Sequence, residues 1–235
     1  MTDRTALRDS LIDALRACRA AEREVFAALD PAARDAPGPD GGWSPKDNLA
    51  HLAAWRRRQA TKMAAIREGK PEPALPGGED QDATNAVFHA ERADWSWSRV
   101  VADADASADE LIAEVEAAGD DSLEDQKVVG SIMSDGPEHD LAHLGSIAPT
   151  VGLEEKVLGL AELTRALIDR GGWPDRSAAY ARYNLACFHA LGGRLDVARA
   201  LLRLALPVDG DLRRHAPTDR DLIALRDEIP TLAVR

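Results

Sequence analysis

The sequence has few cysteines, few aromatic residues and no long apolar run. Its two cysteines, Cys18 and Cys187, lie far apart and lack CxxC spacing. They indicate buried thiols in a reducing compartment, and they exclude a disulfide framework. No stretch of 18 apolar residues and no signal peptide is present, so we expect a cytoplasmic protein that does not enter a membrane. Aromatic residues make up 4% of the chain and β-branched runs are nearly absent, which favours helix almost everywhere.

Positive charge is scarce in the first two thirds of the chain. Residues 1–151 contain 16 Lys and Arg against 29 Asp and Glu, a net charge of −13. Residues 152–235 contain 13 against 12, a net charge of +1, and together they give the total of −12. The acidic first part disfavours nucleic-acid binding, which needs a basic surface. The change in charge predicts a domain boundary near residue 152, with domains over 1–151 and 152–235.

The periodicity of apolar residues predicts an all-α fold. Leucines and other apolar residues recur at three- and four-residue steps from about Thr5 to Leu29, the pattern of one amphipathic helix. Ser44-Pro45-Lys46-Asp47 has the composition of a capping box and predicts the start of a second helix. The next expected elements are a helix over 82–102, a helical segment from a second capping box at 107–110, a loop with room for one helical turn over 120–136, and a helix over 137–151. We therefore expect an antiparallel four-helix bundle.

Three histidines form the candidate site. His139 and His143 are four residues apart and share one face of the predicted fourth helix. His51 lies on the apolar stripe of the second helix, so it points toward the core. In a bundle the three imidazoles can meet at one ion, and they suit Zn²⁺, Ni²⁺ or Fe²⁺. The alternative is that His51 is a hydrogen-bonded core histidine and that the pair is solvated at a helix start.

Other polar and aromatic residues are candidates for a substrate pocket beside the ion. Glu138 is a possible general base, although an acid at a helix N-terminus is also favourable for structural reasons alone. Trp55, Asn85 and Trp95 are candidate pocket-lining residues, with core packing as the alternative for the tryptophans. The arginines at 56–58 lie mainly off the apolar stripe, so we expect a solvated face there. No catalytic residue is assigned.

A resemblance to a known family lies in the run Gly42-Trp43-Ser44-Pro45-Lys46-Asp47-Asn48-Leu49-Ala50-His51-Leu52-Ala53-Ala54-Trp55. It resembles the second helix of the DinB/YfiT-like superfamily, in which W-[ST]-x-x-[DE]…H carries the first metal-ligand histidine. Asn85, the segment 91–97 and the HxxxH pair resemble its ClbS/DfsB branch. The resemblance covers about residues 5–150. It implies a four-helix bundle with a metal triad at His51, His139 and His143.

The same resemblance implies a range of activities. Members carry out metal-dependent transfer of low-molecular-weight thiols, hydrolysis, or self-protection against reactive metabolites. The branch often reads H-Y-x-E-H on its last helix, whereas this chain has Asp140 and Ala142 at the tyrosine and glutamate positions. Whatever those two residues do in the family is therefore not carried over to this chain, and only the ligand positions match.

The C-terminal part has a resemblance of its own. Residues 183–192, followed by Asp196, Ala198, Leu202 and Ala205, look like a tetratricopeptide hairpin formed by helices over 175–191 and 194–206. One repeat cannot bury its own apolar face, so we expect it to pack on neighbouring helices, on a second copy of the chain, or on a protein partner.

Three functions follow from these patterns. The first is a metal-dependent protein that acts on a small reactive or hydrolysable molecule, with or without a thiol cosubstrate, in detoxification or self-resistance. The second is a metal-free protein of the ClbS/DfsB type that sequesters a small molecule. The third is an interaction protein that binds its partner through the tetratricopeptide-like helices.

Overall fold

The protein is all-helical, as the sequence predicts. The computed structural model describes residues 4–38, 42–170 and 172–233, and within these ranges it contains helices and no strand. Residues 39–41 of the connection before the second predicted helix lie outside the described residues. Among the described helices, none has both the length and the apolar character needed to cross a membrane.

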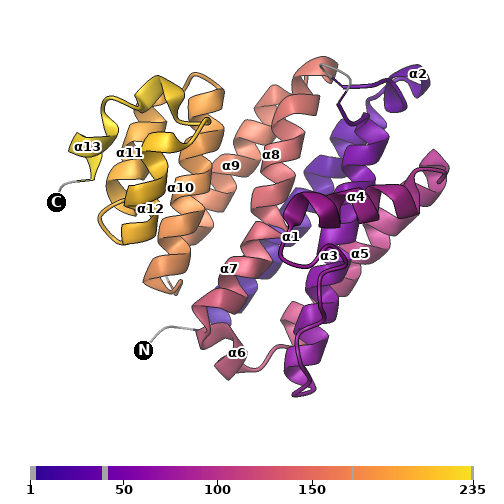
Figure 1. Ribbon diagram of the computed structural model, residues 1–235, viewed down its shortest axis with the longest axis horizontal. Helices are drawn as coiled ribbons and strands as arrows, with labels where there is room; N and C mark the ends of the chain where they lie inside the picture. Colours follow the sequence, from indigo (N-terminus) through magenta and orange to yellow (C-terminus); the bar gives the residue numbers. More distant parts are fainter. Residues whose placement is uncertain (1–3, 39–41, 171, 234–235) are drawn as a thin grey trace.

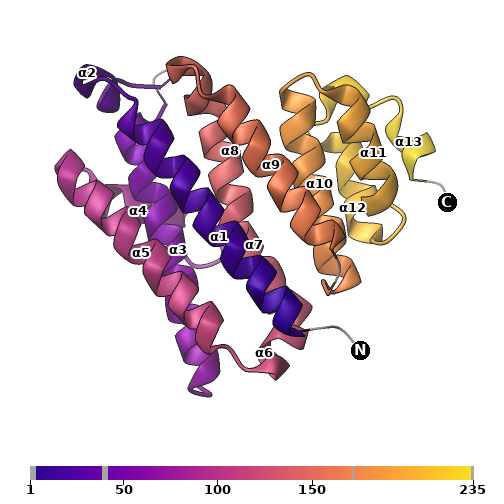
Figure 2. The ribbon, with the colours of Figure 1, turned by 180° about the vertical axis from the view of Figure 1, so that it is seen from behind.

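The N-terminal part is built from long helices that share one core. Its main helices are α1 (Arg4–Ala27), α3 (Pro45–Arg67), α5 (Trp97–Ala117) and α8 (Pro137–Ile147). Helix α1 packs against α5 and α8, and α3 packs against the same two helices (Figures 1 and 2). The short helix α7 (Gln126–Ser134) leads into α8. Two further helices, α2 (Pro31–Arg34) and α4 (Gln81–Arg92), lie beside α3.

The predicted capping box starts α3. The Ser44 hydroxyl accepts a hydrogen bond from the Asp47 backbone N–H at 3.1 Å, and the Asp47 carboxylate accepts one from the Ser44 backbone N–H at 3.0 Å. Pro45 occupies the first helical position, where its missing N–H costs nothing. This fixed start sets the rotational phase of α3 and therefore the direction in which His51 points.

The second predicted capping box is wrong, and so is the helix expected over 82–102. The chain instead breaks between α4 and α5, where the Ser96 hydroxyl accepts a hydrogen bond from the Arg99 backbone N–H and caps α5. Ser107 is buried in the middle of α5, and its hydroxyl donates to the Ala104 carbonyl at 3.1 Å. A serine can satisfy its hydroxyl on the preceding turn, so its presence alone does not mark a helix start.

The loop expected over 120–136 is mostly helical. It contains α6 (Asp120–Glu124) and α7, and the Asp125 carboxylate caps α7 by accepting from the Lys127 backbone N–H at 2.8 Å. The apolar residues of these helices are buried: Leu123, Val128, Val129, Ile132 and Met133. Helices α6 and α7 are too short for the sequence to show the 3.6-residue spacing of apolar residues that marks a helix. They are stable because their apolar side chains pack against the rest of the protein.

The C-terminal helices pack directly on the N-terminal helices. They are α9 (Glu154–Asp169), α10 (Asp175–Leu191), α11 (Leu195–Ala205), α12 (Gly210–His215) and α13 (Ile229–Leu232). Helix α9 lies against α1 and α8, and α10 lies against α7, α8 and α9. One cluster of buried apolar side chains runs from α1 to α13 without interruption. The tight α10–α11 hairpin turns at Gly193, whose φ of +72° favours glycine.

Candidate metal centre

His51, His139 and His143 meet between α3 and α8. The Nε2 atoms of His51 and His139 are 2.9 Å apart, and one ring nitrogen from each of the three residues lies within 4.8 Å of the others. The ring centroid of His143 is 5.1 Å from that of His51 and 4.8 Å from that of His139. The structure thus brings together the three histidines that the sequence proposes as one site.

The local sequence explains why α8 presents its histidines here. Gly136 precedes the helix at a point where a Cβ atom would lie 2.8 Å from the Ile132 carbonyl and 2.8 Å from a Leu15 methyl group on α1. Only glycine allows this close approach. Pro137 then takes the first helical position. The four-residue spacing of His139 and His143 places both rings on the face of α8 that looks toward α3.

Burial keeps the three imidazoles neutral. Burial, with a further contribution from His143, lowers the pKa of His51 to about 3. Burial also lowers the pKa of His139 well below its usual value, and the neighbouring imidazoles add to this shift. The pKa of His143 is lowered by burial as well. Neutral imidazole is the form that binds a metal ion, so no ligand has to lose a proton near neutral pH.

Asn48 orients His143. The Asn48 amide nitrogen donates to the carbonyls of Trp43 at 3.2 Å and Ser44 at 2.9 Å, which turns its oxygen toward the ring of His143. This oxygen is 2.6 Å from His143 Nδ1, and it can only accept. His143 therefore carries its proton on Nδ1 and presents Nε2 as a free ligand atom. Three neutral nitrogen donors around one point, one of them oriented by an amide, fit Zn²⁺, Ni²⁺ or Fe²⁺.

Asn48→Ala should weaken metal binding without removing a ligand. Loss of the oxygen that orients a ligand histidine typically lowers metal affinity about 10- to 100-fold. Competition with a chromophoric chelator measures the change. Asn85→Ala is the matched control, because Asn85 bonds the Trp55 indole rather than a histidine of the triad. Equal affinity in Asn48→Ala and the wild type would show that Asn48 has no orienting role.

Aromatic rings surround the triad. Trp43 meets His51 edge-on with ring centroids 4.6 Å apart, and it stacks on His89 at 5.6 Å. The Trp55 ring lies 6.3 Å from both His51 and His139, and its Nε1 donates to Asn85 Oδ1 at 3.0 Å. Trp55 and Asn85, two of the predicted pocket residues, thus adjoin the triad. Trp43 and Asn48 were not assigned to the site, although Asn48 lies on the same helical stripe as His51.

The other two predicted pocket residues have different neighbours. The Glu138 carboxylate faces the C-terminal helices, where it accepts a hydrogen bond from the Asn184 amide of α10. Burial raises the pKa of Glu138 to about 7, and that hydrogen bond opposes the shift. The Trp95 ring lies between the guanidinium groups of Arg92 and Arg99, 5.3 Å and 3.9 Å from its centroid. Both residues contact groups outside the triad.

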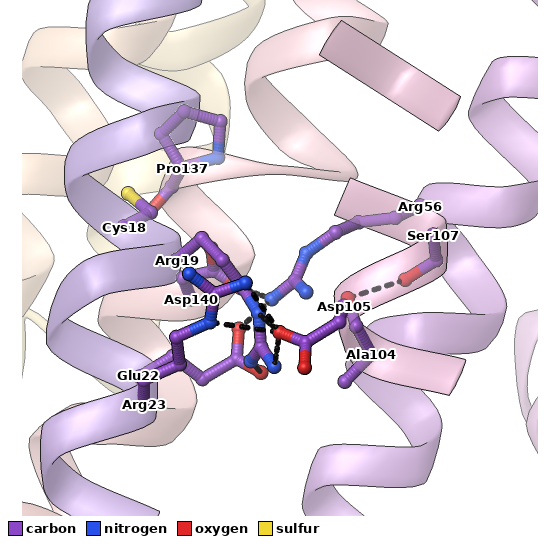
Figure 3. A network of polar contacts seen from close by, with 10 residues as sticks. All are labelled: Cys18, Arg19, Glu22, Arg23, Arg56, Ala104, Asp105, Ser107, Pro137 and Asp140. Atoms are coloured by element: carbon purple, nitrogen blue, oxygen red, sulfur yellow. Dashed lines mark hydrogen bonds and ion pairs between the residues drawn. The ribbon is translucent and has the colours of Figure 1, made fainter. Parts of the chain in front are cut away.

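Behind the triad lies a buried network of charged side chains (Figure 3). Arg56, on α3, is 2% exposed and forms ion pairs with Glu22 of α1 and, at 2.6 Å, with Asp140 of α8. Arg19 joins Glu22 to Asp105 of α5. The expectation that Arg56 lies on a solvated face is wrong. Although burial acts to lower the pKa of Arg56, Asp140 and Glu22 together raise it above its usual value, so this arginine stays charged.

The network connects the helices that carry the three histidines. Asp140 follows His139 directly, and Arg56 lies on the same helix as His51. The ion pair between them therefore ties the His51 helix to the His139 and His143 helix. It also gives Asp140 a structural role.

Comparison with known proteins gives one match. A sequence model of the DinB superfamily matches residues 14–148, more than half of the chain, and this range includes all three histidines. No curated protein and no solved structure matches the chain significantly. The matched range contains the helices that carry the three histidines and ends one residue after α8. The chain belongs to the DinB superfamily.

Proposed function

We propose that the protein binds one divalent transition-metal ion at His51, His139 and His143 and uses it on a small reactive or hydrolysable molecule. The observation that carries this proposal is the convergence of three neutral imidazoles at one point. An ion with three protein ligands keeps one or two positions open and supplies Lewis acidity, which polarises a carbonyl or lowers the pKa of a thiol or water. The reaction would be a hydrolysis or a thiol transfer, in detoxification or self-resistance.

The state of the protein's own thiols supports an external thiol cosubstrate. Cys18 is fully buried, and burial raises the pKa of its thiol well above the usual value. Burial and the nearby Asp219 and Asp221 raise the pKa of Cys187. A thiol with a raised pKa supplies little thiolate, which is the reactive form. If the reaction is a thiol transfer, the sulfur would therefore come from a low-molecular-weight thiol.

Metal analysis of protein purified without a histidine tag tests the proposed function. The wild type should contain about one divalent ion per chain, and His139→Ala should contain none, because two imidazoles hold such an ion much more weakly than three. His215→Gln is the matched control, since it removes an exposed histidine outside the triad. Equal metal content in wild type and His139→Ala, or no metal in either after incubation with Zn²⁺, Ni²⁺ or Fe²⁺, would contradict the proposal.

A second measurement separates the two reaction types. Thiol transfer consumes free thiol, whereas hydrolysis does not. Loss of thiol from a mixture of cysteine and an electrophile such as 1-chloro-2,4-dinitrobenzene, measured with and without a chelator, reports the first. Release of nitrophenol from a nitrophenyl ester reports the second. A metal-dependent activity should disappear in His139→Ala and survive in His215→Gln.

A further inference from the structure

A cavity of about 780 Å³ is lined jointly by α8 and the C-terminal helices that pack on it. Its walls come from α8, α9, α10 and residues 212–221, so the bundle and the C-terminal part both contribute. Most of the wall is apolar, including Leu141, Leu158, Leu185 and Phe188. This volume and lining are typical of a site for a small organic molecule. His139 also touches the cavity, so the cavity and the metal centre lie on adjoining faces of α8.

The charged groups on the wall are mainly acidic. Four carboxylates line the cavity: Glu138, Glu154, Asp219 and Asp221. Within the described part of the chain, none of the four forms an ion pair with a lysine or arginine, although Nε2 of His215, on the same wall, lies 3.4 Å from the Asp219 carboxylate. Acids elsewhere, such as Glu22, Asp105 and Glu228, have arginine partners. The wall's own arginine, Arg194, donates to His189 Nδ1 and to backbone carbonyls instead.

The polar end of the cavity lies beside aromatic rings. Ligand atoms of Cys187, Asp219 and Asp221 lie within 4.8 Å of one another, and the Tyr183 hydroxyl donates to Asp219 at 2.6 Å. Tyr183 lines the same cavity and can contribute attraction between a cation and an aromatic face. Tyr180 and Phe188 also line it, each with an arginine guanidinium group already over its ring. An inorganic ion would contact the acidic end and leave the apolar walls exposed to water. A molecule with a cationic group and an apolar body would contact the acidic end and also cover the apolar walls.

We propose that this cavity binds an organic cation, an amine or quaternary ammonium group attached to an apolar body, as a site separate from the metal centre. The carboxylates of Asp219 and Asp221 attract the cationic group, with Glu138 and Glu154 adding negative charge. The apolar walls of α8 and α10 cover the body of the molecule. The site requires the C-terminal helices, and it gives them a role in ligand binding beyond packing on the bundle.

Fluorescence titration with two matched probes tests this proposal. Monodansylcadaverine has an amine tail, and dansyl-6-aminohexanoate has the same fluorophore with a carboxylate tail. The amine probe should bind at least tenfold more tightly. Asp221→Asn with Glu154→Gln should weaken its binding about tenfold and should not weaken binding of the anionic probe, because the lost charges attract a cation and repel an anion. Ala142→Trp, at an exposed residue of the cavity wall, should block both probes.

Matched variants control for charge and folding. Asp109→Asn with Glu155→Gln removes the same charge from exposed positions outside the cavity and should leave amine binding unchanged. His51→Ala should also bind the amine normally, which separates this proposal from the metal centre. Equal affinity for the two probes, unchanged binding in Ala142→Trp, or loss of binding in His51→Ala would each overturn it. The proposal would also be overturned if the protein does not bind the amine but binds Zn²⁺ from ZnCl₂ and loses that binding when Asp221 is replaced.

Discussion

Replacement of Arg56 by methionine should lower the free energy of unfolding by about 3–5 kcal/mol, the usual cost of removing one partner from a buried ion pair. Glu22 and Asp140 are 0% and 1% exposed, so the substitution leaves two carboxylates in the core without their shared cation. A buried carboxylate that has lost its cation lowers the free energy of unfolding by more than the intact ion pair contributes to it. Urea denaturation followed by circular dichroism measures the change.

Two control variants identify the cause. Arg57→Met removes the neighbouring arginine, which is partly exposed and pairs with Asp103 and Glu110, and it should cost about 1 kcal/mol or less. Adding Asp140→Asn to Arg56→Met removes the carboxylate that is left without a cation, whereas Glu22 keeps its ion pair with Arg19, so the double variant should recover part of the lost stability. A loss in Arg56→Met no larger than in Arg57→Met would mean that the network does not stabilise the bundle.

Binding of Zn²⁺ should stabilise the protein by about 4 kcal/mol when the free ion is present at 1,000 times its Kd, because a ligand that binds only the folded state adds RT ln(1 + [L]/Kd). The triad exists only when α3 and α8 are packed together, so the unfolded chain offers no comparable site. Calorimetric melting with and without the ion measures the shift, and a chelator should reverse it.

The same melting experiment on His139→Ala tests whether the stabilisation by Zn²⁺ depends on the triad. This variant should show little stabilisation by Zn²⁺, whereas His215→Gln should respond as the wild type does. A shift of equal size in His139→Ala would place the ion elsewhere, with the Cys187, Asp219 and Asp221 group as the next candidate. No shift in the wild type would argue against a metal at this centre.

The triad could be predicted because its geometry depends on local patterns. The capping box at Ser44 fixes the phase of α3, and the apolar stripe that follows places His51 on the inner face. The HxxxH spacing does the same for α8. Asn48 lies on the same face of α3 as His51, but its hydrogen bond to His143 joins residues 95 positions apart in the chain. The spacing of apolar residues along a helix does not reveal a hydrogen bond between two side chains on different helices.

Arg56 could not be placed from the sequence for a related reason. An arginine beside two others on a helix usually indicates a solvated face, and Arg57 and Arg58 do remain partly exposed. Arg56 is buried because it pairs with Glu22 and Asp140, which lie far from it in the sequence but contact its guanidinium group in the folded protein. The break before α5 was missed for a simpler reason: Ser96 and Ser107 are both plausible caps, and only the packed structure selects between them.

The contacts of α1 have a consequence for how the chain folds during synthesis. This helix packs against α8 and α9, and 109 residues separate Ala27 from Pro137. At the usual translation rate of about 5–20 residues per second, α8 is synthesised roughly 5–20 s after α1. The apolar stripe of α1, with Leu7, Leu11 and Leu15, stays without these partners through that interval. The nascent chain is therefore most open to chaperone binding, or to aggregation, through its first helix.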